Sequence, residues 1–309
     1  MITLRDVAER VGVSISTVSL VLNDRAEGRV NAVLAERIRA MAHEMKYVPN
    51  HLARSLSTNR TATVGLVSDQ VATIPFAGHM LAGAQRVLWD EGYLLMLIDT
   101  AGNDEIQGPA ALSLVQRNVE ALIFAVTHHK VVDLPAVPTE APIVVLDGRP
   151  SKDGGQVDFV VPDEERGARA AVEHLIAYGH RRIGFCNVPA LFPEAASLRM
   201  KGYLSALEAA HLPADPCLIV AAESADTCAA IEPARRLLGL PEPPTAVFCF
   251  GDQLAMGFYQ VARDLGIKIP DELSIVGFDN QQYIADCLSP GLTTVQLPHS
   301  EMGEWAARQ

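Results

Sequence analysis

The sequence lacks long hydrophobic runs and has few cysteines. No run of about 18 apolar residues occurs, and the first ten residues, MITLRDVAER, carry charges where a secretory signal needs an apolar segment. We therefore expect a cytoplasmic protein that works at the nucleoid and has no contact with a membrane. The cysteines form no CxxC pair and no ligand spacing with histidine, so we predict reduced core thiols, no metal site and no cofactor. These cysteines are Cys186, Cys217, Cys228, Cys249 and Cys287.

Motifs of common enzyme classes are also missing. The chain has no GxSxG elbow, no GxxxxGK[ST] phosphate loop and no GxGxxG after a predicted strand. His128 and His129 follow an apolar run, but neighbouring residues of a strand point to opposite faces, so we expect two loop residues and no shared metal. An α/β enzyme remains an alternative, and turnover of a candidate ligand would favour it.

Basic residues are scarce overall but concentrate at the start of the chain. The formal net charge is −12, yet residues 1–60 hold nine Lys or Arg against six Asp or Glu, whereas the remainder holds 16 against 31. Phosphate binding requires a local basic face, and an acidic body limits non-specific adhesion. The first sixty residues are therefore a candidate DNA-binding segment.

Three short helices are predicted in this segment. Thr3 and Asp6 suit the start of the first helix, and Gly12 suits its end. Ser14 caps the second helix only two residues later, and Asn31 caps the third. Apolar residues recur at three- and four-residue steps along each helix, which predicts one small shared core.

The tight turn at Gly12 predicts a helix-turn-helix, whose second helix lies in the major groove of DNA. In GVSISTVSLVLND, helical spacing turns Val18 and Val21 inward, and short side chains face outward. Hydroxyls can donate to phosphates or reach base edges, and aliphatic groups can touch thymine methyls. The alternative is that the hydroxyls only cap a solvated helix. The outward or marginal positions are Ile15, Ser16, Thr17, Ser19 and Leu20.

The segments TLRDVAERVGVSISTVSLVLN and RVNAVLAERIRAMAHEMKYVPNHLARSL closely resemble the DNA-binding head of the lactose/galactose repressor family, over residues 3–60. The TVS…VLN and Y-x-PN-x-x-ARSL elements are specific to it. Members often carry Arg at the position of Leu20, so a bidentate contact to guanine is lost here. The resemblance implies base readout by Ile15, Ser16 and Leu20. It implies DNA contacts by Thr3, Ser14, Ile15, Ser16, Thr17, Ser19, Leu20, Asn23, Asn31, Tyr47, Asn50, His51, Arg54 and Leu56.

The resemblance also implies a hinge helix at HLARSL, within a linker over residues 50–60. Residues 50–58 are fewer than the roughly 12 to 15 that an isolated helix needs, so we expect this segment to be disordered without DNA. Two copies in a dimer could fold together in the minor groove, with Arg54 near phosphate and Leu56 wedged between base steps. An ordinary flexible linker is the alternative.

Strand-like apolar runs alternate with helical patterns from Thr63 onward. They are TVGLVSD, YLLMLID, VEALIFAVT, PIVVLDG, RIGFCNV, CLIVAAE, TAVFCFGD and LSIVGFDN. Continuous apolar strands between helices predict an α/β fold with parallel sheets buried on both faces. Two sets of four strands predict two lobes, with passages between them near residues 151–164 and 292–298.

Acidic residues end several of these strands, and ligands of open α/β sheets bind beyond the carboxyl ends of strands. Carboxylates accept hydrogen bonds from hydroxyls and Arg donates in a fork, which suits sugars, polyols or planar heterocycles. Asp99 and Asp252 precede helices, so N-capping is the favoured role for them. Asp147 and Asp279 are the better ligand candidates. The strand-end acids are Asp69, Asp99, Asp147, Asp252 and Asp279.

The body resembles the effector domain of the same family and the sugar-binding periplasmic proteins that share its fold. The resemblance lies in IPFAGHMLAGAQ, GARAAVEHLIAYGHRRIGF, LRMKGYLSAL, TAVFCFGDQLAMG, PDELSIVGFDN and PGLTTV. It implies that Arg199 is a cleft arginine, that Asp147 and Asp279 bind an effector, and that Phe76 forms a wall. Phe192 either stacks on a sugar face or only packs. The candidate effector residues are Phe76, Asp147, Phe192, Arg199, Asp252 and Asp279.

Together these features predict a three-helix helix-turn-helix head (1–49), a hinge helix (50–60) and a two-lobed, type I periplasmic-binding-protein-like effector domain (61–309). The expected function is a ligand-responsive transcriptional repressor, not an enzyme. It would bind a palindromic double-stranded DNA operator as a homodimer, under control of a small molecule such as a sugar. A solute-binding transport protein is an alternative that requires export. The helix begun at Ser300 has no stop signal, so we expect the chain to continue beyond Gln309.

Overall fold

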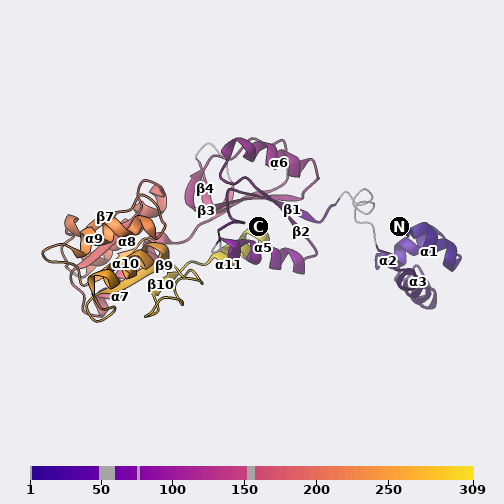
Figure 1. The fold of residues 1–309 in the computed structure, drawn as a ribbon. Helices are drawn as coiled ribbons and strands as arrows, with labels where there is room; N and C mark the ends of the chain where they lie inside the picture. The colour runs from indigo at the N-terminus through magenta and orange to yellow at the C-terminus, as the bar shows by residue number, and fades with distance from the viewer. Residues whose placement is uncertain (1, 49–59, 75–76, 152–156) are drawn as a thin grey trace. The chain divides into compact units, whose positions relative to one another are not determined.

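A computed structural model describes residues 2–48, 60–74, 77–151 and 157–309 (Figure 1). The chain divides into two compact units, Met1–Thr61 and Ala62–Gln309. The predicted hinge helix and Phe76 lie outside the described residues. No helix within the described ranges is both long and apolar enough to span a membrane.

The first unit contains the three predicted helices, α1 (Leu4–Val11), α2 (Ile15–Leu22) and α3 (Ala32–Glu44). Thr3 and Asp6 form a capping box, in which the Thr3 amide donates to the Asp6 carboxylate at 2.7 Å. Gly12 ends α1 in the left-handed region at φ 80°, which glycine adopts without strain. The Ser14 and Asn31 side chains accept from backbone amides of the next helix at 3.1 and 2.8 Å. All four predicted helix boundaries are therefore confirmed.

The predicted inward and outward faces of α2 are also confirmed. Val18 and Val21 are completely buried, together with Val7 of α1 and Ile38 of α3, whereas Ile15 is 43% exposed. Burying such side chains contributes roughly 1.5–3 kcal/mol each, so this small core fixes which face of α2 points to solvent.

The second unit contains two five-stranded parallel sheets, as predicted for an α/β fold, and most of their successive strands are joined through helices. The first sheet has the order β2-β1-β3-β4-β5 and the second has the order β10-β9-β8-β6-β7. The strands of the first sheet are β1 (Thr63–Ser68), β2 (Leu94–Asp99), β3 (Ala121–Val132), β4 (Ile143–Pro150) and β5 (Asp158–Val160). The strands of the second are β6 (Ile183–Asn187), β7 (Ile219–Ala221), β8 (Ala246–Cys249), β9 (Ser274–Asp279) and β10 (Thr293–Gln296).

Helices cover these sheets and define two lobes. The N-lobe is the first sheet with α5, α6 and α11, and the C-lobe is the second sheet with α7, α8, α9 and α10 (Figure 1). The α-helices are α5 (Gly78–Asp90), α6 (Gln107–Val115), α7 (Glu164–Ala177), α8 (Pro193–Ala209), α9 (Ile231–Leu238), α10 (Asp252–Leu265) and α11 (His299–Arg308). Single 3₁₀ turns are η1 (Asp104–Ile106), η3 (Pro216–Leu218) and η4 (Cys228–Ala230).

The chain returns to the N-lobe after β10, because α11 packs directly on α5 (Figure 1). Their backbones approach so closely that a Cβ on Gly303 would lie 2.0 Å from the Met80 carbonyl oxygen. A Cβ on Gly83 would lie 2.1 Å from the Ser300 carbonyl oxygen. Glycine at both positions therefore allows α11 and α5 to pack at this distance, which any larger residue would prevent.

All eight predicted strands are present, but β5 and β10 were not predicted as strands. Both lie in the segments predicted as passages between the lobes. Each is short, partly exposed and at a sheet edge, so no continuous apolar run marks it in the sequence.

The prediction of five core thiols is wrong for three of the cysteines. Cys186 and Cys249 are buried in the second sheet, whereas Cys217, Cys228 and Cys287 are exposed, and all five are free. The exposed three lie in 3₁₀ turns or a loop and not within a strand of the sheet.

Candidate functional site

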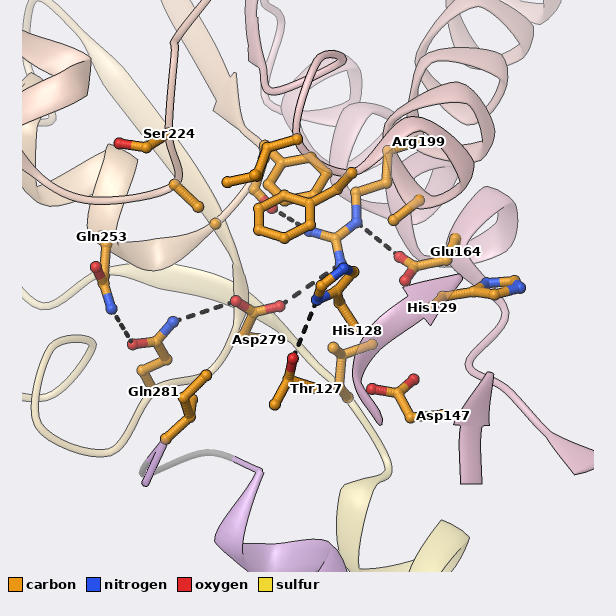
Figure 2. Close-up of a pocket in the computed structure, with 18 of the residues that line it drawn as sticks. Thr127, His128, His129, Asp147, Glu164, Arg199, Ser224, Gln253, Asp279 and Gln281 are labelled. Carbon is orange, nitrogen blue, oxygen red and sulfur yellow. Dashed lines mark hydrogen bonds and ion pairs between the residues drawn. The ribbon is translucent and has the colours of Figure 1, made fainter. Parts of the chain in front are cut away.

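A cavity of about 490 Å³ is lined by residues of both lobes of the second unit (Figure 2). Its walls include the carboxyl ends of β3, β4 and β9 and the residues after β8, where the parallel topology predicts a ligand. The lining residues are Gln70, Ile74, Thr127, His128, His129, Asp147, Glu164, Leu191, Phe192, Ala195, Arg199, Ser224, Ala225, Asp226, Phe250, Gly251, Gln253, Asp279, Gln281, Leu297 and His299.

Arg199 of α8 is the most tightly held group of this cavity. Its Nε donates to Glu164 Oε2 at 2.6 Å, its Nη2 lies 3.6 Å from Asp279 Oδ1, and its Nη1 donates to the Phe250 carbonyl (Figure 2). The guanidinium carbon also lies 4.1 Å and 3.8 Å from the ring centroids of Phe250 and Phe278. Carboxylate pairing and cation–π contacts keep this buried arginine charged and fix its orientation.

Asp279 lies at the end of β9 and connects Arg199 to a polar network. Its Oδ2 accepts from the Gln281 side chain at 3.2 Å, and Gln281 in turn accepts from Gln253 at 3.4 Å (Figure 2). Its backbone has φ 100°, a conformation that L residues rarely adopt. Strained backbone of this kind clusters at functional sites.

Burial raises the pKa of Asp279 to about 7, despite the lowering effect of Arg199. Between about pH 4 and 7 the folded protein keeps a proton that the unfolded chain loses, so this carboxyl lowers the free energy of unfolding as pH rises. Asp279→Asn is therefore expected to gain stability relative to the wild type from pH 4 to 7 and to level off above. Urea unfolding at a series of pH values measures this, and a pH-independent difference would contradict it.

Asp147 lies within β4, three residues before its end, and its carboxyl group is buried. Its backbone has φ 62°. Its Oδ1 has no hydrogen-bond partner among the described residues, and burial raises its pKa well above the ordinary value. An unpaired buried polar atom costs about 1–3 kcal/mol, which a bound ligand could recover.

The prediction that His128 and His129 are loop residues is wrong. Both lie within β3, and both line the cavity (Figure 2). The pairing of β3 with β4 shifts register between Ala125 and Lys130, and this bulge breaks the alternation that would send neighbouring side chains to opposite faces. The His129 ring is buried and neither ring nitrogen has a hydrogen-bond partner among the described residues.

Phe192 packs in an aromatic group at the joint between the lobes. Its ring is stacked on Phe250 with centroids 5.6 Å apart, and it makes a T-shaped contact with the His128 ring, with centroids 4.2 Å apart. Because His128 belongs to the N-lobe and Phe192 to the C-lobe, this contact crosses the cavity. Burial lowers the pKa of His128 to about 4, so the ring is neutral at physiological pH.

Three of the predicted strand-end acids have structural roles. Asp69 pairs with Lys130 at 2.8 Å, and Asp99 accepts from the Ala101 amide at 2.8 Å rather than capping a helix. Asp252 does not line the cavity and is not the N-cap of α10, because Gly251 holds that position. Its carboxylate accepts instead from Thr294 Oγ1 and the Gln281 amide, both at 2.6 Å, and so joins α10 to the loop after β9 and to β10.

Of the other predicted effector residues, the cavity brings together Asp147, Phe192, Arg199 and Asp279, and Phe76 lies outside the described residues. Sequence reasoning missed Glu164, although an acid in the first turn of a helix in PDEERGARA is a visible signal. It also missed the glutamines, because nothing in their sequence context marks a contact made through tertiary structure. The missed polar groups are Gln70, Thr127, His128, His129, Glu164, Ser224, Asp226, Gln253, Gln281 and His299.

A second candidate site is the hydroxyl face of α2 in the first unit. Ser14 Oγ lies 2.8 Å from both Ser16 Oγ and Thr17 Oγ1, so three hydroxyls share one small patch at the start of the helix. At the C-terminal end of α2, the Asn23 side chain donates to the Ser19 carbonyl at 2.8 Å. This face carries short hydroxyls beside the aliphatic side chains of Ile15 and Leu20, and α2 contains no Lys, Arg, Glu or Gln.

The remaining predicted DNA contacts lie elsewhere in the first unit or outside the described part of the chain. Thr3 and Asn31 act as helix caps, Leu20 is half-buried on α2, and Tyr47 packs against the core of the first unit. The residues outside the described ranges are Asn50, His51, Arg54 and Leu56.

Two family models match the chain. Residues 3–50 match the model of bacterial regulatory proteins of the lacI family, and residues 172–309 match a periplasmic binding protein-like domain. The chain is thus similar to transcriptional regulators at its start and to ligand-binding proteins over its second half.

Curated relatives and a solved structure cover nearly the whole chain. The HTH-type transcriptional repressor PurR of Vibrio atlanticus (strain LGP32) is 32% identical over 310 residues, covering 98% of this chain and 89% of the relative. The ribose operon repressor of Escherichia coli (strain K12) is 32% identical over 309 residues, covering 99% and 91%. The crystal structure of the lac repressor dimer bound to operator and the anti-inducer ONPF has a TM-score of 0.81 at 25% identity, covering 99% and 91%.

Proposed function

The chain belongs to the lacI family of bacterial regulatory proteins, and from this premise we propose that it represses transcription as a dimer bound to a palindromic operator. The observation that carries the proposal is that one chain combines an exposed hydroxyl face on a helix-turn-helix with a buried polar cavity between two lobes. The first feature suits DNA and the second suits a small effector.

For the first unit, we propose that α2 lies in the major groove. Ile15, Ser16 and Leu20 would contact bases, whereas Thr17 and Ser19 would bind phosphates. The absence of long charged side chains on the hydroxyl face would let the helix backbone approach the bases closely. This part of the protein would act in the cytoplasm at the nucleoid, where its operator lies.

For the dimer, exposed apolar residues along one sheet edge support a two-fold interface. On the edge strand β2, Leu94, Met96 and Leu97 are 57%, 38% and 37% exposed, and Trp89 of the neighbouring α5 is 67% exposed. An apolar edge of this kind is a liability in a monomer and is normally covered by a partner. A second copy related by a two-fold axis would cover it and would present two heads to a palindrome.

For the effector, we propose a sugar or sugar derivative bound by Asp147, Asp279 and Arg199, with Phe192 as a further wall. Its binding would change the angle between the lobes and thereby the ability of the paired heads to engage DNA. Allosteric couplings are typically about 1–3 kcal/mol, which corresponds to a roughly 5- to 150-fold change in operator affinity. The effector would act as an inducer or as a corepressor, depending on which arrangement of the lobes it favours.

Selection of bound sequences from a pool of random duplexes tests this proposal. The expected result is a recovered motif with two half-sites related by two-fold symmetry, bound by two copies of the chain. Recovery of no motif, or of a single asymmetric half-site bound by one copy, would contradict the proposal.

A further inference from the structure

We infer that the cavity selects an uncharged ligand with adjacent hydroxyl groups, that it excludes anionic ligands such as sugar phosphates, and that His129 is a specificity-determining residue. This inference rests on the proposed function, because it assigns a chemical class to the effector of that same cavity. Three independent features of the described residues support it: the helix ends, the charge of the lining and the unpaired polar atoms.

The helix ends that reach the cavity already hold carboxylates of this chain. An N-terminus of a helix is the usual binding site for an anion, because its amides are free and its dipole is positive. Here Glu164 begins α7 and lines the cavity. Glu194 in the first turn of α8 pairs with Arg149, and Asp252 begins α10, but neither is a lining residue. A ligand phosphate at the start of α7 would therefore meet the carboxylate of Glu164.

The lining offers no unpaired cation among the residues that the structure describes. Arg199 is the one Lys or Arg side chain among them, and its pairing with Glu164 at 2.6 Å leaves no net positive charge. Asp226 and Asp279 add further carboxyl groups to the same lining. Burying an anion without a cationic partner costs several kcal/mol, so a phosphorylated ligand is disfavoured relative to its uncharged parent.

The histidines of the lining do not alter this balance. Burial lowers the pKa of His128 and of His299 to about 4, and burial also lowers the pKa of His129. All three imidazoles are therefore neutral at pH 7. A neutral imidazole supplies one donor and one acceptor rather than a positive charge.

The unpaired polar atoms match a hydroxyl group. His129 lies in the bulge of β3 and Asp147 lies on the adjacent strand β4, opposite that bulge (Figure 2). Asp147 Oδ1 and both ring nitrogens of His129 are buried and unpaired within the described residues. Adjacent hydroxyls can donate to one residue and accept from the other, whereas a phosphate oxygen can only accept.

Two kinds of molecule carry this chemistry, namely free sugars or polyols, and nucleosides through their ribose. Both present adjacent hydroxyls without charge, and both have an apolar face that can pack against an aromatic wall such as Phe192. The planar base of a nucleoside distinguishes the two, so the experiment includes both series.

We call the expected preference for an uncharged ligand over its phosphorylated form the charge rule. Calorimetry and thermal shift on the purified full-length chain test it with matched pairs of ligands. The pairs are ribose with ribose 5-phosphate, glucose with glucose 6-phosphate, and adenosine with AMP, and inorganic phosphate serves as a further probe. We expect an uncharged member to bind and its phosphorylated partner to bind at least a hundredfold more weakly. Tighter binding of a phosphorylated member, or no binding by any uncharged member at millimolar concentration, would overturn the inference.

Variants at His129 test the specificity role for the uncharged ligand that binds most tightly. His129→Ala is expected to weaken it by about tenfold or more, and His129→Gln, which keeps a donor and an acceptor, is expected to recover most of that loss. His174→Ala is the matched control, because His174 is exposed on α7. Equal affinities for the wild type and His129→Ala would remove His129 from the site.

Different results would contradict the charge rule and the proposed function. If a sugar phosphate binds and alters operator affinity, the charge rule is wrong and the proposed function stands. If an uncharged ligand binds as expected but operator affinity never changes, the charge rule stands and the proposed function is wrong.

Discussion

Arg199→Ala is expected to abolish the effector response and to destabilise the second unit by about 3–5 kcal/mol. The substitution leaves Glu164 and Asp279 as buried carboxylates without their cation, and removal of one partner of a buried ion pair has effects of this size. It also removes the contacts of the guanidinium with the rings of Phe250 and Phe278. Urea unfolding followed by circular dichroism measures the stability, and calorimetry measures ligand binding.

Arg169→Ala is the matched control, because Arg169 pairs with Glu173 on the surface of α7, where both side chains are about half exposed. We expect no measurable change in its unfolding midpoint or in ligand binding. Folded Arg199→Ala protein should still bind operator, because the head is a separate compact unit. Normal stability with an intact ligand response would show that Arg199 holds neither the cavity nor the effector.

Ser16→Glu is expected to reduce operator affinity roughly a hundredfold, which corresponds to about 2.8 kcal/mol. Ser16 is exposed in the first turn of α2, within the hydroxyl patch that it shares with Ser14. A carboxylate there would face DNA phosphates and would displace a short group that permits close approach. Fluorescence anisotropy with a labelled operator at a fixed salt concentration measures this effect.

Ala40→Glu adds the same charge to an exposed position of α3 and serves as the control. We expect it to lower operator affinity by a few-fold at most, because it does not alter α2. Both variants should keep the wild-type unfolding midpoint, since neither position contributes to the core of the head. Equal losses of affinity in the two variants would mean that α2 is not the helix that reads the operator.

The head could be predicted well from its sequence because its determinants are local. Caps such as Thr3, Ser14 and Asn31 act on amides within three residues, and Gly12 acts on its own backbone. The buried positions Val18 and Val21 follow from helical periodicity alone. What these patterns leave undetermined is contact with DNA, which depends on a partner.

The cavity could be predicted only in part. The ends of the parallel strands pointed to Asp147 and Asp279, because topology fixes where those ends meet. His128 and His129 were missed because a bulge in β3 breaks the expected alternation of faces. No residue type in the apolar run indicates that bulge.

Two further differences between prediction and structure concern the role of Asp252 and the edge strands β5 and β10. Both arise from contacts with residues that are distant in the sequence. Asp252 precedes a helix and therefore reads as a cap, yet Thr294 and Gln281 supply stronger donors from elements far along the chain. The edge strands β5 and β10 form because each passage runs beside an existing sheet edge. Neither effect leaves a periodic signal in the sequence.

The most direct test of the central claim is one titration: the affinity of the full-length protein for its selected operator, measured with and without a saturating ligand of the cavity. The account predicts a change of about 5- to 150-fold with the ligand and no change for Arg199→Ala under the same conditions. An operator affinity that is identical with and without a ligand shown by calorimetry to be bound would contradict it.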